Sequence, residues 1–110
     1  LISFGALGET LNCEGWSHKE GQNLIRQKME YTGIHPVTDE KLYRLQLDGY
    51  EYRVDWSEKL ETLYASVVFS LKAHIFATMR VPDLKIHNDT FLDFTNEKGD
   101  RVSISCNVTN

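Results

Sequence analysis

Within positions 41–56, polar and apolar residues alternate from Tyr43 to Trp56, which is the pattern of strands with one buried face. Asp48-Gly49 interrupts this alternation at its centre. The dipeptide is typical of a two-residue hairpin turn, because both of its positions need a positive φ. Such a turn sets Leu45 opposite Tyr52 and brings the large apolar side chains onto one face. The segment therefore predicts a β-hairpin of fixed register.

A second alternating segment covers positions 63–81, where every odd residue is apolar and most even residues are polar. This favours one long strand from about Val67 to Val81, preceded by one helical turn at 57–64. A continuous helix is the alternative, but it would place Phe69 and Phe76 opposite its apolar stripe. Whether residues 57–66 are helical or extended stays open.

Two turn signals continue this segment into a meander. Pro82-Asp83 is typical of the centre of a turn, and a two-residue loop there would set Ala73 opposite Leu92. A further turn at 96–100 leads into a strand at 101–109, which places Leu92 opposite Ile104 and Phe94 opposite Val102. The apolar face would then be continuous over three consecutive strands.

The N-terminal part carries a helical signal. Ser17-His18-Lys19-Glu20 has the form of a capping box, and Gly33 followed by His35-Pro36 is typical of a helix end. The apolar and long side chains at helical spacing between these signals are Leu24, Ile25, Lys28 and Met29. We therefore expect a helix over 17–32 with a narrow apolar stripe.

These elements predict an α+β fold in a single domain over 1–110. One N-terminal helix would pack on a curled antiparallel meander of four to five strands, and the segment 1–16 would add at most a short strand. In its order of elements this arrangement resembles cystatin-like and nuclear transport factor 2-like domains. The resemblance is one of topology alone and implies no activity.

Composition narrows the function classes. The chain has 110 residues, a formal net charge of −4 and a pI near 5.5, so we expect no nucleic-acid partner held by bulk positive charge. The apolar segment 63–81 contains Lys72, His74 and Arg80, which argues against membrane insertion. Neither a metal nor another cofactor is expected, because no ligand spacing or nucleotide-binding motif is present.

Cys13 and Cys106 admit two interpretations. They are either isolated thiols of a cytoplasmic protein, which we favour, or a disulfide of a secreted or extracellular one. The glycosylation sequons at Asn88 and Asn107 are a weak indication of secretion.

The polar face of the expected meander holds two candidate sites. His74 beside Asp89 or Asp93 is a candidate general acid–base pair, and a solvated outer face is the alternative. On the same face, Phe76 and Phe91 would form an apolar patch for a partner, unless the N-terminal segment covers them.

The hairpin places Arg44 directly opposite Arg53 on its polar face. Like charges in this position need neutralising, either by Glu51 and Asp55 or by an acidic partner. We include both arginines among the candidate binding residues. Trp16 and Trp56 are interpreted as packing residues.

No sequence motif indicates catalysis. The leading hypothesis is a non-enzymatic interaction domain that binds another protein, or a second copy of itself, through the sheet surface or edge. The alternative is a small-ligand-binding or acid–base enzyme domain with a pocket between helix and sheet.

Overall fold

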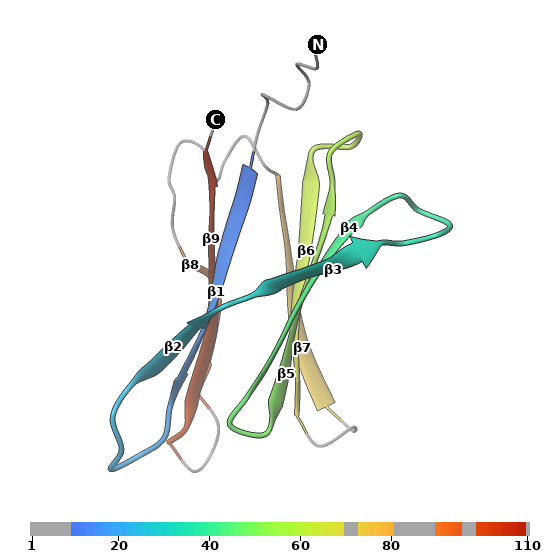
Figure 1. Ribbon diagram of the computed structural model, residues 1–110. Coiled ribbons are helices and arrows are strands. Elements are labelled where there is room, and N and C mark those ends of the chain that lie inside the picture. Colours follow the sequence, from blue (N-terminus) through green and yellow to red (C-terminus); the bar gives the residue numbers. More distant parts are fainter. Residues whose placement is uncertain (1–9, 70–72, 81–89, 96–98, 110) are drawn as a thin grey trace.

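The computed structural model describes residues 10–69, 73–80, 90–95 and 99–109, and every regular element in these ranges is a β-strand (Figure 1). The strands are β1 (Thr10–His18), β2 (Ile25–Lys28), β3 (Glu30–Ile34), β4 (Lys41–Leu47), β5 (Tyr50–Ser57), β6 (Thr62–Phe69), β7 (Ala73–Arg80), β8 (Thr90–Thr95) and β9 (Arg101–Thr109). The predicted α+β fold is therefore wrong, because the described chain is all-β.

The strands form two antiparallel sheets that face each other (Figure 1). The four-stranded sheet has the order β2-β1-β9-β8, and the five-stranded sheet has the order β3-β4-β5-β6-β7. Each sheet turns one face inward, so the buried side chains of both meet in a single β-sandwich core. The core residues are Leu11, Cys13, Met29, Leu45, Tyr52, Val54, Trp56, Leu63, Ala65, Val67, Leu92, Val102, Ile104 and Cys106.

The helix predicted over 17–32 is wrong, since this segment holds the end of β1, a turn, β2 and most of β3. The alternate residues that β1 buries are Leu11, Cys13, Gly15 and Ser17. Gly15 and Ser17 are not apolar side chains, so the sequence of β1 does not show the alternation of apolar and polar residues that is typical of a strand. The Ser17 hydroxyl donates to the Asp48 carboxylate at 2.9 Å instead of capping a helix.

Met29 is the residue at which the chain first passes from one sheet to the other. It alone separates β2 from β3. Its amide donates to the carbonyl oxygen of Cys13 at 2.9 Å, and its side chain is 3% exposed. One nearly continuous ribbon therefore forms an edge of both sheets and ties them together along one side (Figure 1).

The predicted hairpin over 41–56 is confirmed. β4 and β5 pair with Leu45 opposite Tyr52 and Tyr43 opposite Val54. Asp48 and Gly49 have φ values of 52° and 85°, the left-handed conformation that the turn requires.

The single long strand predicted from Val67 to Val81 is wrong, because the chain folds back into two strands. β6 and β7 pair with each other, with Val67 opposite Ile75 and Leu63 opposite Met79. Odd-numbered residues of β6 lie opposite odd-numbered residues of β7. The apolar residues of both strands therefore keep odd numbers, and the alternation in the sequence does not reveal where the chain reverses. The helical turn expected at 57–64 is absent as well, since β6 begins at Thr62.

The expected pairing of Ala73 with Leu92 is also wrong, because β7 and β8 belong to different sheets. The Pro82-Asp83 turn lies outside the described residues. The pairing of β8 with β9 is confirmed, with Leu92 opposite Ile104 and Phe94 opposite Val102. The predicted register of β8 with β9 was thus correct, but the prediction placed these strands in the same sheet as β7, which is wrong.

The two sheets approach closely where β1 crosses the β4–β5 hairpin. A Cβ atom added to Gly15 would lie 2.5 Å from Leu45 Cδ2 and 3.0 Å from the Tyr52 ring, so only glycine fits without displacement. The fully buried Tyr52 donates its hydroxyl to the carbonyl oxygen of Trp16 at 2.9 Å, a hydrogen bond between the two sheets. Burial raises the pKa of the Tyr52 phenol far above its usual range.

A disulfide joins Cys13 and Cys106, directly opposite residues of β1 and β9. Both cysteines are 2% exposed and belong to the core. Their sequence separation is 93 residues, so the bond closes most of the chain into a loop.

The first prediction concerns this disulfide. We expect the Cys13→Ala/Cys106→Ala variant to lose roughly 3–5 kcal/mol of unfolding free energy, because the unfolded chain regains the entropy of a long loop. Urea unfolding measures the difference. Reductant should destabilise the wild type and leave the variant unchanged; equal stability of the oxidised wild type and the variant would contradict the prediction.

The second prediction concerns Tyr52. Tyr52→Phe leaves the Trp16 carbonyl without its donor, which should cost about 1–3 kcal/mol. Because the pKa of Tyr52 is higher in the folded protein than in the unfolded chain, its contribution is present below the unfolded pKa of about 10 and is lost as the pH rises above it. Urea unfolding between pH 7 and about pH 11 should therefore show a smaller alkaline loss for the variant. If the unfolding free energies of the wild type and the variant fell in parallel with pH, Tyr52 would contribute nothing to the alkaline loss of stability.

Candidate functional site

The strand pairing expected to set His74 beside Asp93 is absent. His74 lies in β7 of the five-stranded sheet and Asp93 in β8 of the four-stranded sheet, while Asp89 lies outside the described residues. The Asp93 carboxylate accepts two hydrogen bonds from the Arg101 guanidinium, at 2.9 and 2.6 Å. This contact lowers the pKa of Asp93 and holds it as an ionised partner of Arg101.

The expected apolar pair, Phe76 and Phe91, is likewise divided between the two sheets. The backbone of Phe76 lies opposite Ser66 in β7, and Phe91 falls at an irregularity of β8 where the pairing with β9 shifts. The strand pairing assumed for this patch is therefore wrong, while the side chains of both residues lie outside the described part of the structure.

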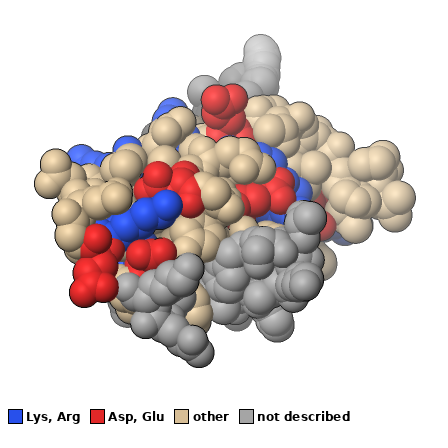
Figure 2. All heavy atoms as spheres, turned by 90° about the horizontal axis from the view of Figure 1, so that it is seen from below, with Lys and Arg blue, Asp and Glu red and all other residues tan. Residues whose placement is uncertain are grey.

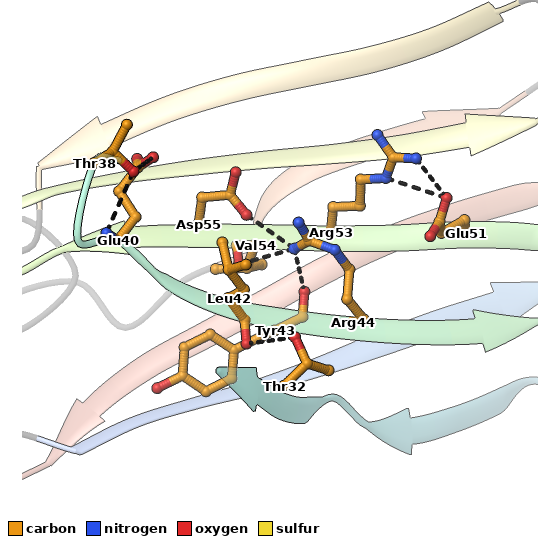
Figure 3. A network of polar contacts seen from close by, with 10 residues as sticks. All are labelled: Thr32, Thr38, Glu40, Leu42, Tyr43, Arg44, Glu51, Arg53, Val54 and Asp55. Atoms are coloured by element: carbon orange, nitrogen blue, oxygen red, sulfur yellow. Dashed lines mark hydrogen bonds and ion pairs between the residues drawn. The ribbon is translucent and has the colours of Figure 1, made fainter. Parts of the chain in front are cut away.

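The two hairpin arginines lie directly opposite each other, and each bonds to an acid of β5 (Figure 3). Arg44 Nη1 lies 2.8 Å from Asp55 Oδ1 and also donates to the Tyr43 carbonyl oxygen. Arg53 Nη2 lies 2.7 Å from Glu51 Oε1. These contacts neutralise the arginines within the hairpin, as expected for the alternative in which Asp55 and Glu51 balance their charge.

Charges of both signs also lie next to each other on the end of the molecule seen in Figure 2. Within the described ranges, no group of three or more His, Cys, Asp or Glu side chains could hold a metal ion. The same part of the chain has no helix long and apolar enough to cross a membrane.

The pocket expected between a helix and the sheet has no counterpart in the described structure. The second sheet occupies the place expected for the helix, and Leu45 and Tyr52 are buried in the space between the sheets. Features on the outside of the sandwich are therefore the candidates for a site.

The hairpin of β3 and β4 extends away from the body of the sandwich (Figure 1), and hydrogen bonds order its connecting loop. His35 Nδ1 accepts the backbone amides of Val37 and Thr38, at 3.1 and 3.2 Å. The His35 amide donates to the Glu40 carbonyl oxygen at 2.8 Å, and the Thr38 hydroxyl donates to the Glu40 carboxylate at 2.8 Å. The loop is thus held in one conformation by its own side chains.

This hairpin exposes three large apolar side chains, which we call the tip surface: Tyr31, Ile34 and Val37. Their exposed fractions are 53%, 55% and 83%. A register shift between Tyr31 and Gly33 places Tyr31 opposite Tyr43 and Ile34 opposite Lys41, so both project from the same face of the hairpin. Val37 stands in the ordered loop beyond them.

A groove of about 690 Å³ lies at the base of the hairpin, where the chain crosses between the sheets. Leu11 and Met29 contribute apolar surface to it, together with the Tyr31 ring, which lies 5.6 Å from the Tyr43 ring between centroids. Apolar surface therefore continues from the tip surface toward the interior of the sandwich.

The tip surface was not found from the sequence because the helix predicted over 17–32 includes the first three residues of β3, the strand that carries Tyr31 and Ile34. His35-Pro36 was interpreted only as a helix stop. The available signal was an isolated Val37 among loop-forming residues, Pro36, Thr38 and Asp39.

Comparison with protein-family models, with curated proteins and with solved structures gives no match. The inferences about function therefore rest on the geometry of this chain.

The third prediction concerns the loop. His35→Ala removes the acceptor of two amides, so we expect hydrogen exchange at Val37 and Thr38 to accelerate by about tenfold, with the sandwich intact. Amide exchange measured by NMR gives the rates. His18→Ala, a substitution of an exposed histidine on β1, is the control. Unchanged exchange at Val37 and Thr38 in the His35 variant would mean that other contacts order the loop.

Proposed function

We propose that this chain is a non-enzymatic protein-binding domain that contacts its partner through the tip surface. The observation that carries the proposal is the hydrogen-bonded loop that presents Val37, 83% exposed, at the end of a projecting hairpin. Loops held on a rigid scaffold are a common location of binding residues. Order in the free state also reduces the entropy lost on binding.

The neighbouring apolar side chains support the same function. Tyr31 is a residue type enriched at protein interfaces, and it stands on the same face as Ile34. Burying these side chains together with Val37 in a partner would remove apolar surface from water.

Charge distinguishes between a different protein and a second copy of this chain. Asp39 and Glu40 lie in the loop, and Glu30 lies at the start of β3. The nearby Lys41 is ion-paired with Glu58. Two such tips would repel each other, so the complementary partner is a different protein with an apolar pocket rimmed by basic side chains.

The disulfide supports a partner outside the cytoplasm. Disulfides persist in oxidising compartments and are rare in the cytosol. The Cys13–Cys106 bond therefore favours the secreted interpretation of the two cysteines over the isolated thiols.

The fourth prediction tests this function with Val37→Asp. The variant should lose capture of the partner from extracellular fluid of the source organism, because a charge would enter the apolar contact. Leu60→Asp is the matched control, since Leu60 is 70% exposed in the turn between β5 and β6. Cross-linking and mass spectrometry identify the captured protein, and thermal unfolding checks that both variants fold.

Equal capture by the two variants would refute the proposal. Light scattering over a range of concentrations provides the second measurement. An increase in mass that Val37→Asp abolishes would identify a second copy of the chain as the partner and overturn the charge argument.

A further inference from the structure

The outer face of the four-stranded sheet contains a hollow of about 410 Å³. Strand pairing sets Trp16 of β1 and Asp93 of β8 on either side of Ser103 in β9. A small side chain thus stands between two larger ones in the same row across the sheet, which leaves a depression above it. The residues around the hollow are Trp16, His18, Leu24, Asp93, Arg101 and Ser103.

One polar group at this hollow lacks a partner. Trp16 Nε1 is buried and has no hydrogen-bond partner within the described part of the chain. Ser103, which lies opposite Trp16 and is 8% exposed, brings its hydroxyl to the same hollow. Unpaired polar groups in a protein are costly, and a ligand that offers both donors and acceptors would pair them.

The charges around the hollow cancel locally. Arg101 and Asp93 form a two-point contact at 2.6 and 2.9 Å. On the other side of Trp16, Arg26 lies over the indole, 5.3 Å from the ring centroid, and its Nε is 3.6 Å from a Glu14 oxygen. The ion pairs among these described residues leave no net positive charge to select an anion, yet the Asp93–Arg101 pair keeps donors and acceptors available at the rim.

We propose that this hollow binds a neutral carbohydrate. The C–H face of a sugar ring would pack against Trp16 and Leu24, because both offer apolar surface. The sugar hydroxyls, which donate and accept, would bond to Ser103 and to the Asp93–Arg101 pair. The volume lies within the range of roughly 300–1,000 Å³ that is usual for small-molecule sites.

This site is independent of the tip surface. It lies near the end of β1, beside the turn into β2, whereas the tip surface belongs to the hairpin that projects at the other side of the molecule (Figure 1). A failure of one proposal therefore leaves the other standing.

The test is an NMR titration of the intact, oxidised protein with glucose, galactose, mannose, N-acetylglucosamine and their trimers, and with sodium sulfate as the anionic probe. The indole N–H signal of Trp16, assigned with Trp16→Phe, reports binding at the hollow. At least one neutral sugar should shift this signal saturably, and its trimer should bind with equal or higher affinity. Sulfate should leave the signal unchanged.

Ser103→Val fills the floor of the hollow and removes the hydroxyl, so it should weaken sugar binding by at least about tenfold. Ser105→Val is the matched control, because Ser105 occupies the next row of the same strand and does not line this hollow. It should keep affinity within about twofold. No sugar-dependent shift at about 50 mM, an equal effect of both substitutions, or a saturable shift with sulfate alone would each overturn the proposal.

Discussion

The close approach of β1 to the β4–β5 hairpin is the constraint on which the rest of the sandwich depends. Gly15 lets the Tyr52 ring and the Leu45 side chain reach the backbone of the opposite sheet, and the Tyr52 hydroxyl then satisfies a carbonyl oxygen there. The disulfide lies two residues earlier on β1 and holds that strand against β9. β1 is therefore fixed from inside the core and from its neighbour in the sheet.

Both surface features follow from this fixed strand. The side chain of Trp16 points outward because successive strand residues face opposite sides, and positions 15 and 17 face the core. β2 pairs with β1, and β3 continues β2 after one residue, so the direction in which the β3–β4 hairpin leaves the body is set by β1 as well. The tip surface and the hollow are thus two consequences of one strand's placement.

Local pairings could be predicted from the sequence, whereas the partition into sheets could not. The β4–β5 hairpin followed from Asp48-Gly49 and strict alternation, because a two-residue turn determines register without reference to the remaining chain. The β6–β7 reversal left the odd–even pattern intact and was read as one strand. The false helix arose because Ser17-His18-Lys19-Glu20 has the form of a capping box, whereas the Ser17 side chain is buried in β1 and bonds to Asp48, a residue distant in sequence.

The candidate sites show the same division. The Arg44–Arg53 pair and its neutralising acids were visible because all four residues share one hairpin. The hollow joins residues 16, 93 and 103, which meet only through pairings between strands distant in sequence. His74 was assigned to the wrong neighbours for the same reason.

Met29 is a point where chain length matters to both sheets. A residue inserted there would change which side chains of β3 face the core relative to those of β2, because side-chain direction reverses at every position of a strand. The loop between β3 and β4 has no such coupling to the sheets. A fluorophore or affinity tag would thus be tolerated in that loop or beside Gly21, whereas the crossover would accept neither insertion nor deletion.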